Sequence, residues 1–217
     1  MLELAVKTLI AYLLGSLMGA LILGALSGVD IRTQGSGNAG GTNALRTQGK
    51  LFALGVVVID VAKGWFAAGV LPALSLPGIG LDGTLARDWL AVACAAGATA
   101  GHVYPVWWEF RGGKGAATLI GVVLGLAPAL LPVVLAVWLL VVVATGFVGL
   151  GTMLGVAAFP IAIAWRMPAS TALLSFAVLM AVFVVYTHRS NISRMLAGNE
   201  NRARRLWIVG RLLARSE

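Results

Sequence analysis

Two glycine-rich stretches carry most of the polar chemistry of this chain. The first runs from Gly35 to Arg46, and the second joins Gly101-His102-Val103-Tyr104-Pro105 to Arg111-Gly112-Gly113-Lys114-Gly115. Glycines let backbone N–H groups come close to a phosphate, and Arg and Lys supply the countercharge. Each stretch follows a long apolar segment. This combination predicts anion chemistry at a membrane surface.

The first stretch places hydroxyl, amide and guanidinium groups among its glycines. These groups belong to Ser36, Asn38, Thr42, Asn43 and Arg46. Arg binds phosphate through two parallel hydrogen bonds. A polar loop between helices, with glycines for its turns, is the alternative. The density of the run favours a binding loop.

The second stretch resembles a nucleotide-binding P-loop only superficially. That motif requires Ser or Thr after its lysine, whereas Gly115 follows Lys114, and Trp108 stands where the first glycine belongs. ATP or GTP hydrolysis is therefore unsupported. The residues fit a glycine-rich anion site at the start of an apolar helix, with Lys114 and Thr118 one helical turn apart. A charge that snorkels at a helix end is the alternative.

Four further ionisable residues lie within or at the ends of apolar segments. Asp60 and Lys63 are three residues apart and share a helix face, where such residues usually pair or face a cavity. An intrahelical pair that stiffens the bundle remains an equal alternative. His102 and His188 each close an apolar segment, and each is either a general base or a hydrogen-bonding group.

The composition indicates an integral membrane protein. Of the 217 residues, 59% are hydrophobic and 11% are charged, whereas soluble domains carry about 25% charged residues. We expect a single membrane-embedded domain over 1–217. The net charge of +8 lies beside the apolar segments, so it indicates anionic lipid headgroups rather than nucleic acid. Cys94 is expected to be a small buried residue, and no cluster of cysteines and histidines suggests a metal.

The apolar segments predict an all-α protein with seven transmembrane helices. A span needs about 20 apolar residues, and several candidates are short, so five or six spans remain possible. Pro128 and Pro132 mark a turn, as does Met167-Pro168. The first segment is long enough to span a bilayer, so we expect a retained helix rather than a signal peptide. The candidates are Ala5–Leu26, Leu51–Leu74, Trp89–Tyr104, Ala116–Leu131, Pro132–Phe147, Leu150–Trp165 and Ala169–Thr187.

The distribution of Lys and Arg predicts the orientation in the membrane. With seven spans, the basic residues of 30–50, those of 111–114 and the basic tail 189–217 all lie on one side, which is the cytoplasmic side. Little beyond Arg87 and Arg166 lies on the other side. The N-terminus is then outside and the C-terminus cytoplasmic, and both glycine-rich stretches share one face with the tail.

Three motifs in order along the chain resemble those of the PlsY acyltransferases. They are Ser36 to Arg46, Gly101 to Pro105 with Arg111 to Thr118, and His188 to Glu200; Asp60-Val-Ala-Lys63-Gly64 also fits the family. The departures are Gly41 for Ala, Tyr104 for Phe and Arg111 for Lys, and none alters the charge. The resemblance covers nearly the whole chain.

This resemblance implies a bacterial inner-membrane enzyme of seven helices whose active site faces the cytoplasm. It would transfer an acyl group from acyl phosphate, not from acyl-CoA or acyl carrier protein, to the 1-hydroxyl of glycerol-3-phosphate. The products would be phosphate and 1-acyl-glycerol-3-phosphate (lysophosphatidic acid), in the first step of phospholipid synthesis. Expected partners are these substrates, membrane lipids and the enzyme that makes acyl phosphate, without a cofactor, a metal or nucleic acid.

The same resemblance sorts the candidate residues by role. Acyl phosphate is a mixed anhydride with an activated carbonyl, so the enzyme mainly aligns two anions and neutralises their charge. We expect the substrate phosphate to take the hydroxyl proton, since no His-Asp pair stands at catalytic spacing, but either histidine remains an alternative. The catalytic candidates are Ser36, Arg46, Lys114, His188 and Asn191; the substrate-binding candidates are Gly37, Asn38, Gly40, Thr42, Asn43, His102, Gly112, Gly113, Gly115 and Thr118; the structural candidates are Asp60, Lys63 and Glu200.

A small transporter of phosphate or of a polyol phosphate is the competing function. Asp60 and Lys63, inside a span, would suit such a protein. A transporter places its binding residues near the midplane of several spans. Here the polar residues crowd one interface, which favours an interfacial enzyme. A lipid-binding scaffold would not need three such motifs.

Overall fold

The computed structural model describes residues 1–213, and over that range every regular element is a helix. The chain divides into two compact units, Met1–Pro128 and Ala129–Glu217. The first unit contains α1 (Leu2–Gly15), α2 (Gly19–Leu26), α3 (Gly41–Thr47), α4 (Lys50–Trp65), α5 (Arg87–Val103) and α6 (Ala116–Leu126). The second contains α7 (Leu131–Thr145), α8 (Val148–Arg166), α9 (Thr171–Thr187), α10 (Arg189–Leu196) and α11 (Ile208–Leu213).

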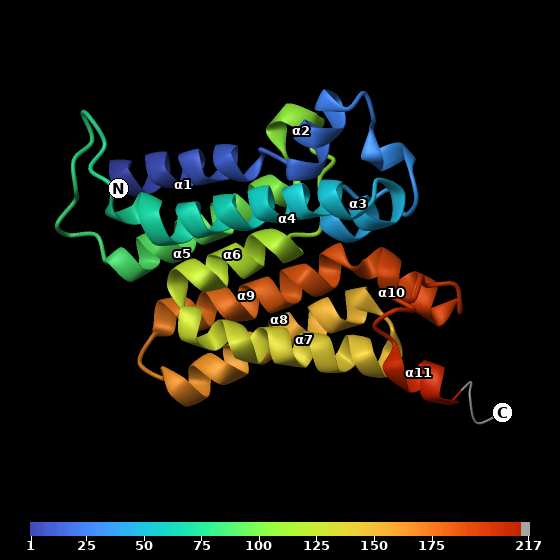
Figure 1. The fold of residues 1–217 in the computed structure, drawn as a ribbon. Coiled ribbons are helices and arrows are strands. Elements are labelled where there is room, and N and C mark those ends of the chain that lie inside the picture. The colour runs from blue at the N-terminus through green and yellow to red at the C-terminus, as the bar shows by residue number, and fades with distance from the viewer. Residues whose placement is uncertain (214–217) are drawn as a thin grey trace. The chain divides into compact units, whose positions relative to one another are not determined.

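In the first unit, α1 packs along α5, and α4 packs along α6 (Figure 1). Glycines make both contacts close. A Cβ at Gly101 of α5 would overlap the carbonyl of Tyr12 in α1, and a Cβ at Gly64 of α4 would overlap the carbonyl of Thr118 in α6. Small residues allow helices in a membrane to approach in this way. The ends of α5 and α6, which flank the second glycine-rich stretch, are therefore held firmly.

The first expected span is two helices rather than one. α1 and α2 are bent by 46° at residues 16–18. Two buried side chains of α4 serve the backbone at the break: Lys63 Nζ donates to the Leu17 carbonyl at 3.0 Å, and the Gly19 N–H donates to Asp60 Oδ1 at 3.2 Å. The sequence shows no proline here, and the groups that satisfy the broken ends lie some forty residues away. The uniformly apolar sequence of this segment therefore does not indicate the break between α1 and α2.

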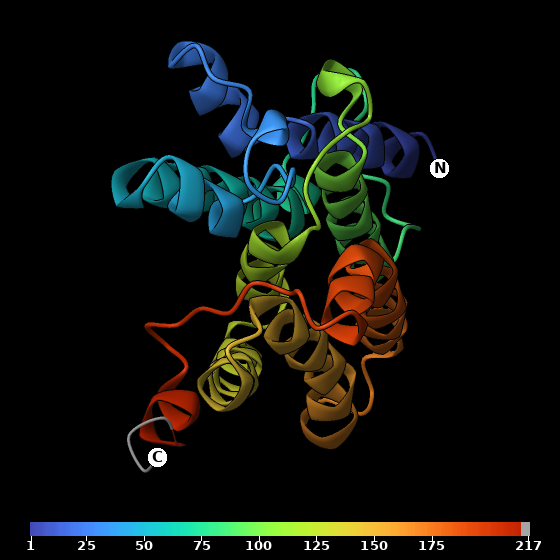
Figure 2. The ribbon, with the colours of Figure 1, turned by 90° about the vertical axis from the view of Figure 1, so that its right-hand side faces the viewer.

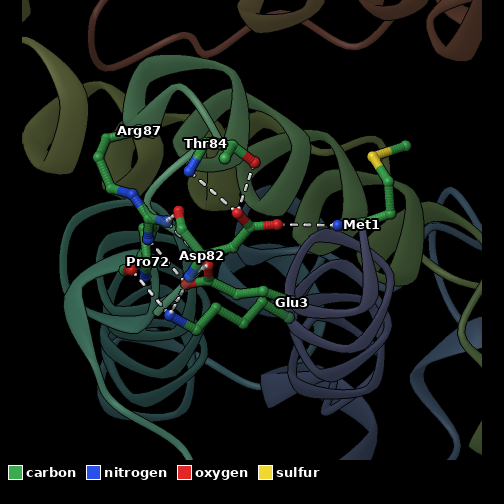
Figure 3. A network of polar contacts seen from close by, with 7 residues as sticks. Met1, Glu3, Pro72, Asp82, Thr84 and Arg87 are labelled. Atoms are coloured by element: carbon green, nitrogen blue, oxygen red, sulfur yellow. Dashed lines mark hydrogen bonds and ion pairs between the residues drawn. The ribbon is translucent and has the colours of Figure 1, made fainter. Parts of the chain in front are cut away.

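The opposite end of the first unit is closed by a network of ion pairs (Figure 3). Glu3 accepts from Lys7 at 2.7 Å and from Arg87 at 2.7 and 2.8 Å, and the Asp82 N–H donates to it at 2.8 Å. Asp82 in turn accepts from the Met1 ammonium at 3.0 Å. The hydroxyl of Thr84 and that ammonium lower the pKa of Asp82 to about 2. This network fastens the start of α1 and the loop before α5, away from the end that carries α2 and α3 (Figure 1).

In the second unit, α8 packs against both α7 and α9 (Figure 2). α10 continues from α9 with a bend of 52°. The tail returns to the end of α7 through Arg202, whose guanidinium lies 4.6 Å from the centre of the Phe147 ring and 4.1 Å from that of Trp207. Such cation–π contacts hold an otherwise polar segment against the helices. Arg215 of the predicted basic tail lies outside the described residues.

A helix occupies the site of every expected span, with shifted ends. The fourth was expected to run to Leu131, but α6 ends at Leu126 because Pro128 begins a separate 3-10 turn. Among residues 1–213, three stretches are long and apolar enough to cross a membrane, and up to five if each bent pair counts as one. α5 and α6 fall short of that test, with 17 and 11 residues. The three stretches are Lys50–Ala73, Pro128–Thr145 and Val148–Arg166.

Candidate functional site

Asn43 organises the first glycine-rich stretch. This buried side chain lies in the first turn of α3, and its Oδ1 accepts the Ser36 N–H at 2.9 Å. Its Nδ2 donates to the carbonyls of Ile31 at 3.2 Å and Gln34 at 2.9 Å. Gly35 has a φ of +56°, and a Cβ there would overlap Asn43 Oδ1. Asn43 therefore shapes the loop on which Ser36 and Asn38 stand.

Arg32 joins this loop to the segment that precedes the second stretch. Its guanidinium pairs with Asp30 at 2.8 Å and donates to the Trp108 carbonyl at 3.2 Å. The hydrogen bonds from Arg32 lower the pKa of Asp30, so the pair stays charged at neutral pH. Arg32 was not expected at the site, because a single basic residue in a loop belongs to no sequence pattern that indicates its partner.

The backbone of the second stretch folds back onto the end of α5. The Gly112 N–H donates to the Val103 carbonyl at 3.2 Å, and the Gly113 N–H donates to the His102 carbonyl at 3.1 Å. Neither glycine has room for a side chain. A Cβ at Gly112 would stand 2.7 Å from Pro105 Cδ, and a Cβ at Gly113 would overlap His102 Nε2. The turn therefore requires residues without a Cβ atom at both positions.

The two glycine-rich stretches meet at Gly113. A Cβ built there would lie 3.0 Å from the carbonyl oxygen of Ala39, in the first stretch, and would overlap the ring of His102. The expected convergence of the two stretches is therefore present within the first unit. Ala39 was missed as a participant, because it contributes a backbone oxygen that no side-chain pattern reveals.

The predicted helical relation between Lys114 and Thr118 is wrong. Gly115 is the N-cap of α6 with a φ of +87°, so Lys114 lies before the helix and not one turn below Thr118. The left-handed glycine redirects the chain between them. Lys114 is partly buried in the loop, while Thr118 Oγ1 is buried and has no hydrogen-bond partner among the described residues.

Asp60 and His102 form a buried pair that the sequence did not reveal. Asp60 Oδ1 lies 3.6 Å from His102 Nδ1 and 2.8 Å from Lys63 Nζ. Spacing along the chain indicated no His-Asp pair; α4 and α5 bring these two residues together, at a distance longer than a hydrogen bond. The intrahelical pairing of Asp60 with Lys63, one of two alternatives, is the one observed.

In the second unit, His188 is buried where α9 ends. Its Nδ1 lies 2.8 Å from the Val184 carbonyl and 3.3 Å from the hydroxyl of Thr187. A carbonyl only accepts, so Nδ1 carries a proton, and the lone pair of the neutral ring is on Nε2. The end of the helix thus sets both the orientation and the tautomer of this histidine.

Glu200 holds the third motif together. One of its oxygens accepts from Asn191 Nδ2 at 2.9 Å, and the other accepts from Arg194 Nε at 2.6 Å. Asn191 also packs against Gly149, where a Cβ would lie 2.9 Å from its amide. Glu200 thus links Asn191 to Arg194, and its structural role stays a prediction.

The remaining candidates of the first stretch differ in exposure. Thr42 and Arg46 are exposed on α3, whereas Asn38 and Gly40 are partly buried, and a Cβ at Gly40 would stand 2.8 Å from Asn38 Nδ2. Gly37 adopts a φ of +71°, which favours glycine. The loop thus presents exposed side chains beside a constrained backbone.

Comparison with known proteins identifies the family. The family model for glycerol-3-phosphate acyltransferase matches residues 5–198. The glycerol-3-phosphate acyltransferase of Clostridioides difficile is 42% identical over 194 residues, covering 89% of this chain and 92% of that protein. That of Sinorhizobium fredii is 42% identical over 192 residues, covering 88% of each chain.

Solved structures agree with the sequence comparison. The crystal structure of PlsY (YgiH), an integral membrane glycerol 3-phosphate acyltransferase, in its glycerol 3-phosphate form superposes with a TM-score of 0.79 at 31% identity, covering 92% of this chain and 94% of that one. Its lysophosphatidic acid form gives a TM-score of 0.77 at 30% identity. The chain is an all-helical, multi-pass membrane protein, and it belongs to the glycerol-3-phosphate acyltransferase family.

Proposed function

We propose that this chain transfers an acyl group from acyl phosphate to the 1-hydroxyl of glycerol-3-phosphate. The product is 1-acyl-glycerol-3-phosphate, made in the first step of phospholipid synthesis. The observation that carries the proposal is the side-chain-free turn at Gly112 and Gly113, which lies beside Lys114 and against Ala39 of the first stretch. Family membership makes the activity an acyltransfer and disfavours a transporter.

The chemistry needs little from the protein beyond alignment and charge. The 1-hydroxyl oxygen attacks the carbonyl carbon of acyl phosphate, the bond from that carbon to the phosphate oxygen breaks, and phosphate leaves with the hydroxyl proton. Arg46 and Lys114 neutralise the two anions. Two substrates held in reactive geometry gain most of the rate from orientation. No acyl-enzyme is required.

The other polar groups bind and orient the substrates in this proposal. The turn at Gly112 and Gly113, whose N–H groups donate to the end of α5, places Lys114 and the backbone at Gly115 against the phosphate of glycerol-3-phosphate, with His102 and Thr118 beside it. In the first stretch, Ser36 and the groups at Gly37, Asn38, Gly40 and Thr42 position headgroup oxygens, while the buried amide of Asn43 holds their loop in shape. Within the second unit, His188 and Asn191 are the candidates for substrate contact, and the end of α9 and Glu200 hold them in place.

The membrane topology completes the proposal. The positive charge of 30–50, 111–114 and 189–217 supports seven spans in the bacterial inner membrane, an outside N-terminus, a cytoplasmic basic tail and a cytoplasmic active site. Residues 1–217 act as one acyltransferase domain. The enzyme that produces acyl phosphate is a candidate partner, because a reactive anhydride is best used where it is made.

The test is a reconstituted assay with purified protein, labelled glycerol-3-phosphate and palmitoyl phosphate. We expect lysophosphatidic acid to form without added metal, and no comparable product from palmitoyl-CoA or from acyl carrier protein. Efficient use of acyl-CoA alone, or loss of all activity on chelation that Mg²⁺ restores, would contradict the proposal.

A further inference from the structure

One carboxylate oxygen, Oδ1 of Asp60, is a junction of three elements. It accepts the Gly19 N–H at 3.2 Å, pairs with Lys63 Nζ at 2.8 Å and faces His102 Nδ1 at 3.6 Å. Asp60 is fully buried, and Lys63 and His102 are almost so. A buried charge is costly unless its partners are well placed. The chain retains one where α2, α4 and α5 meet.

Both glycine-rich stretches depend on the elements that Asp60 joins. α2, whose first N–H is held by Asp60, is followed by residues 27–34 and then by the first stretch. His102, which faces Asp60 through Nδ1, holds the second stretch twice: its carbonyl accepts the Gly113 N–H at 3.1 Å, and its Nε2 lies against Gly113. The ring is thus wedged between the carboxylate and the glycine turn.

We propose that Asp60, acting through His102, is a positioning residue for the binding of glycerol-3-phosphate. The carboxylate fixes the imidazole, and the imidazole fixes the turn at Gly112 and Gly113. This inference rests on the proposed function, which assigns the phosphate of glycerol-3-phosphate to that turn. Asp60 touches neither substrate, so its removal acts on the affinity for one of them and spares the acyl donor.

The Asp60→Asn variant keeps the shape and an acceptor oxygen but removes the charge that orients His102. It also leaves Lys63 buried without its counterion, which threatens folding. The double variant Asp60→Asn/Lys63→Met removes both charges at similar volume and serves as the second form of the test. Glu3→Gln is the matched control, because Glu3 is also a buried carboxylate paired with a lysine of its own helix, at the other end of the unit.

Two measurements on each variant decide the matter: the dissociation constant for glycerol-3-phosphate by calorimetry, and the KM for each substrate with kcat. We expect both Asp60 variants to weaken glycerol-3-phosphate binding and raise its KM by about 10-fold or more. We expect kcat and the KM for acyl phosphate to stay within about 3-fold. Glu3→Gln should lower thermal stability and leave both KM values unchanged.

A double-mutant cycle tests the route through His102. His102→Gln should raise the KM for glycerol-3-phosphate, and adding Asp60→Asn should raise it by less than about 2-fold more, because the two residues act as one unit. Multiplicative effects would overturn that route.

Unchanged glycerol-3-phosphate binding in both Asp60 variants, or equal losses for both substrates, would overturn the whole inference while leaving the proposed function intact. Wild-type protein that binds no glycerol-3-phosphate would overturn both.

Discussion

Adding one methyl group at Gly113 should weaken the use of glycerol-3-phosphate selectively. A Cβ there would overlap His102 Nε2 and stand 3.0 Å from the Ala39 carbonyl, and neither the buried ring nor the backbone oxygen can move freely. The Gly113→Ala variant must therefore shift the turn. The N–H groups of Gly112 and Gly113 already donate within the turn, so a shifted turn acts on the phosphate by displacing Lys114 and the N–H groups at the start of α6 that would hydrogen-bond it.

The size of the effect follows from the number of hydrogen bonds lost. A hydrogen bond to a charged group contributes about 1.5 to 3 kcal/mol. Since about 1.4 kcal/mol is a factor of ten, the loss of one such bond raises the KM for glycerol-3-phosphate by roughly 10- to 150-fold. The KM for acyl phosphate should change by much less. Gly112→Ala should behave alike, because its Cβ would stand 2.9 Å from the Val103 carbonyl.

The assay is steady-state acyltransfer in which each substrate is varied while the other is saturating. Gly83→Ala is the matched control: it adds the same methyl group in a loop of the same unit, and a Cβ there has no atom within 4 Å. It should leave both KM values unchanged. Equal increases for both substrates at Gly113, or no increase at all, would refute the assignment of this turn to the phosphate of glycerol-3-phosphate.

Four further predictions concern polar side chains. Arg46→Ala and Lys114→Ala should each lower kcat/KM by at least about 100-fold, which corresponds to a lost charge-assisted contact of about 3 kcal/mol. Thermal unfolding of both variants should stay cooperative. Near-normal turnover in either variant would exclude that residue from the site. His188→Gln should retain measurable turnover, because the substrate phosphate takes the proton; a loss of about 1,000-fold together with disappearance of a pH–rate limb near pH 6–7 would identify it as the base. Glu200→Gln should lower the unfolding temperature in a thermal-shift assay. The activity per folded protein should change little. Its hydrogen bonds lower the pKa of Asp82 to about 2 from an ordinary 3.8. The ionised carboxylate therefore stabilises the fold above pH 4, and this contribution is lost as the pH falls towards 2. The unfolding temperature of Asp82→Asn should accordingly fall less over this pH range than that of the wild type.

The sequence indicated where the helices and the binding backbone lie, because both depend on local composition. Long apolar runs mark helices in a membrane protein whatever their neighbours, so the expected segments coincide with α1, α2 and α4 to α9, apart from shifted ends and the break between α1 and α2. The glycine-rich stretches were recognisable for the same reason. The helix α3 was not expected, because it lies in the first glycine-rich stretch, which the sequence predicted to be a loop. At Gly113, the absence of a side chain is itself the structural requirement.

Contacts between helices were beyond local composition. The break between α1 and α2 is stabilised by Asp60 and Lys63, which belong to a different helix. The prediction that Lys114 and Thr118 lie one helical turn apart was wrong because Gly115 between them has a left-handed φ. A helical spacing pattern does not reveal such a torsion. The first case depends on side chains distant in sequence, and the second on one backbone torsion.

The site in the first unit combines two kinds of support with different consequences. The glycine turn is fixed by backbone hydrogen bonds and by the lack of room, so almost any side chain at Gly112 or Gly113 disturbs it. The ring of His102, in contrast, is held on one side by a buried charge that a single isosteric change removes. Asp60→Asn and Gly113→Ala should therefore impair the same substrate for different reasons. Because they reach the turn through the same imidazole, their combination should cost less than the product of the two separate effects.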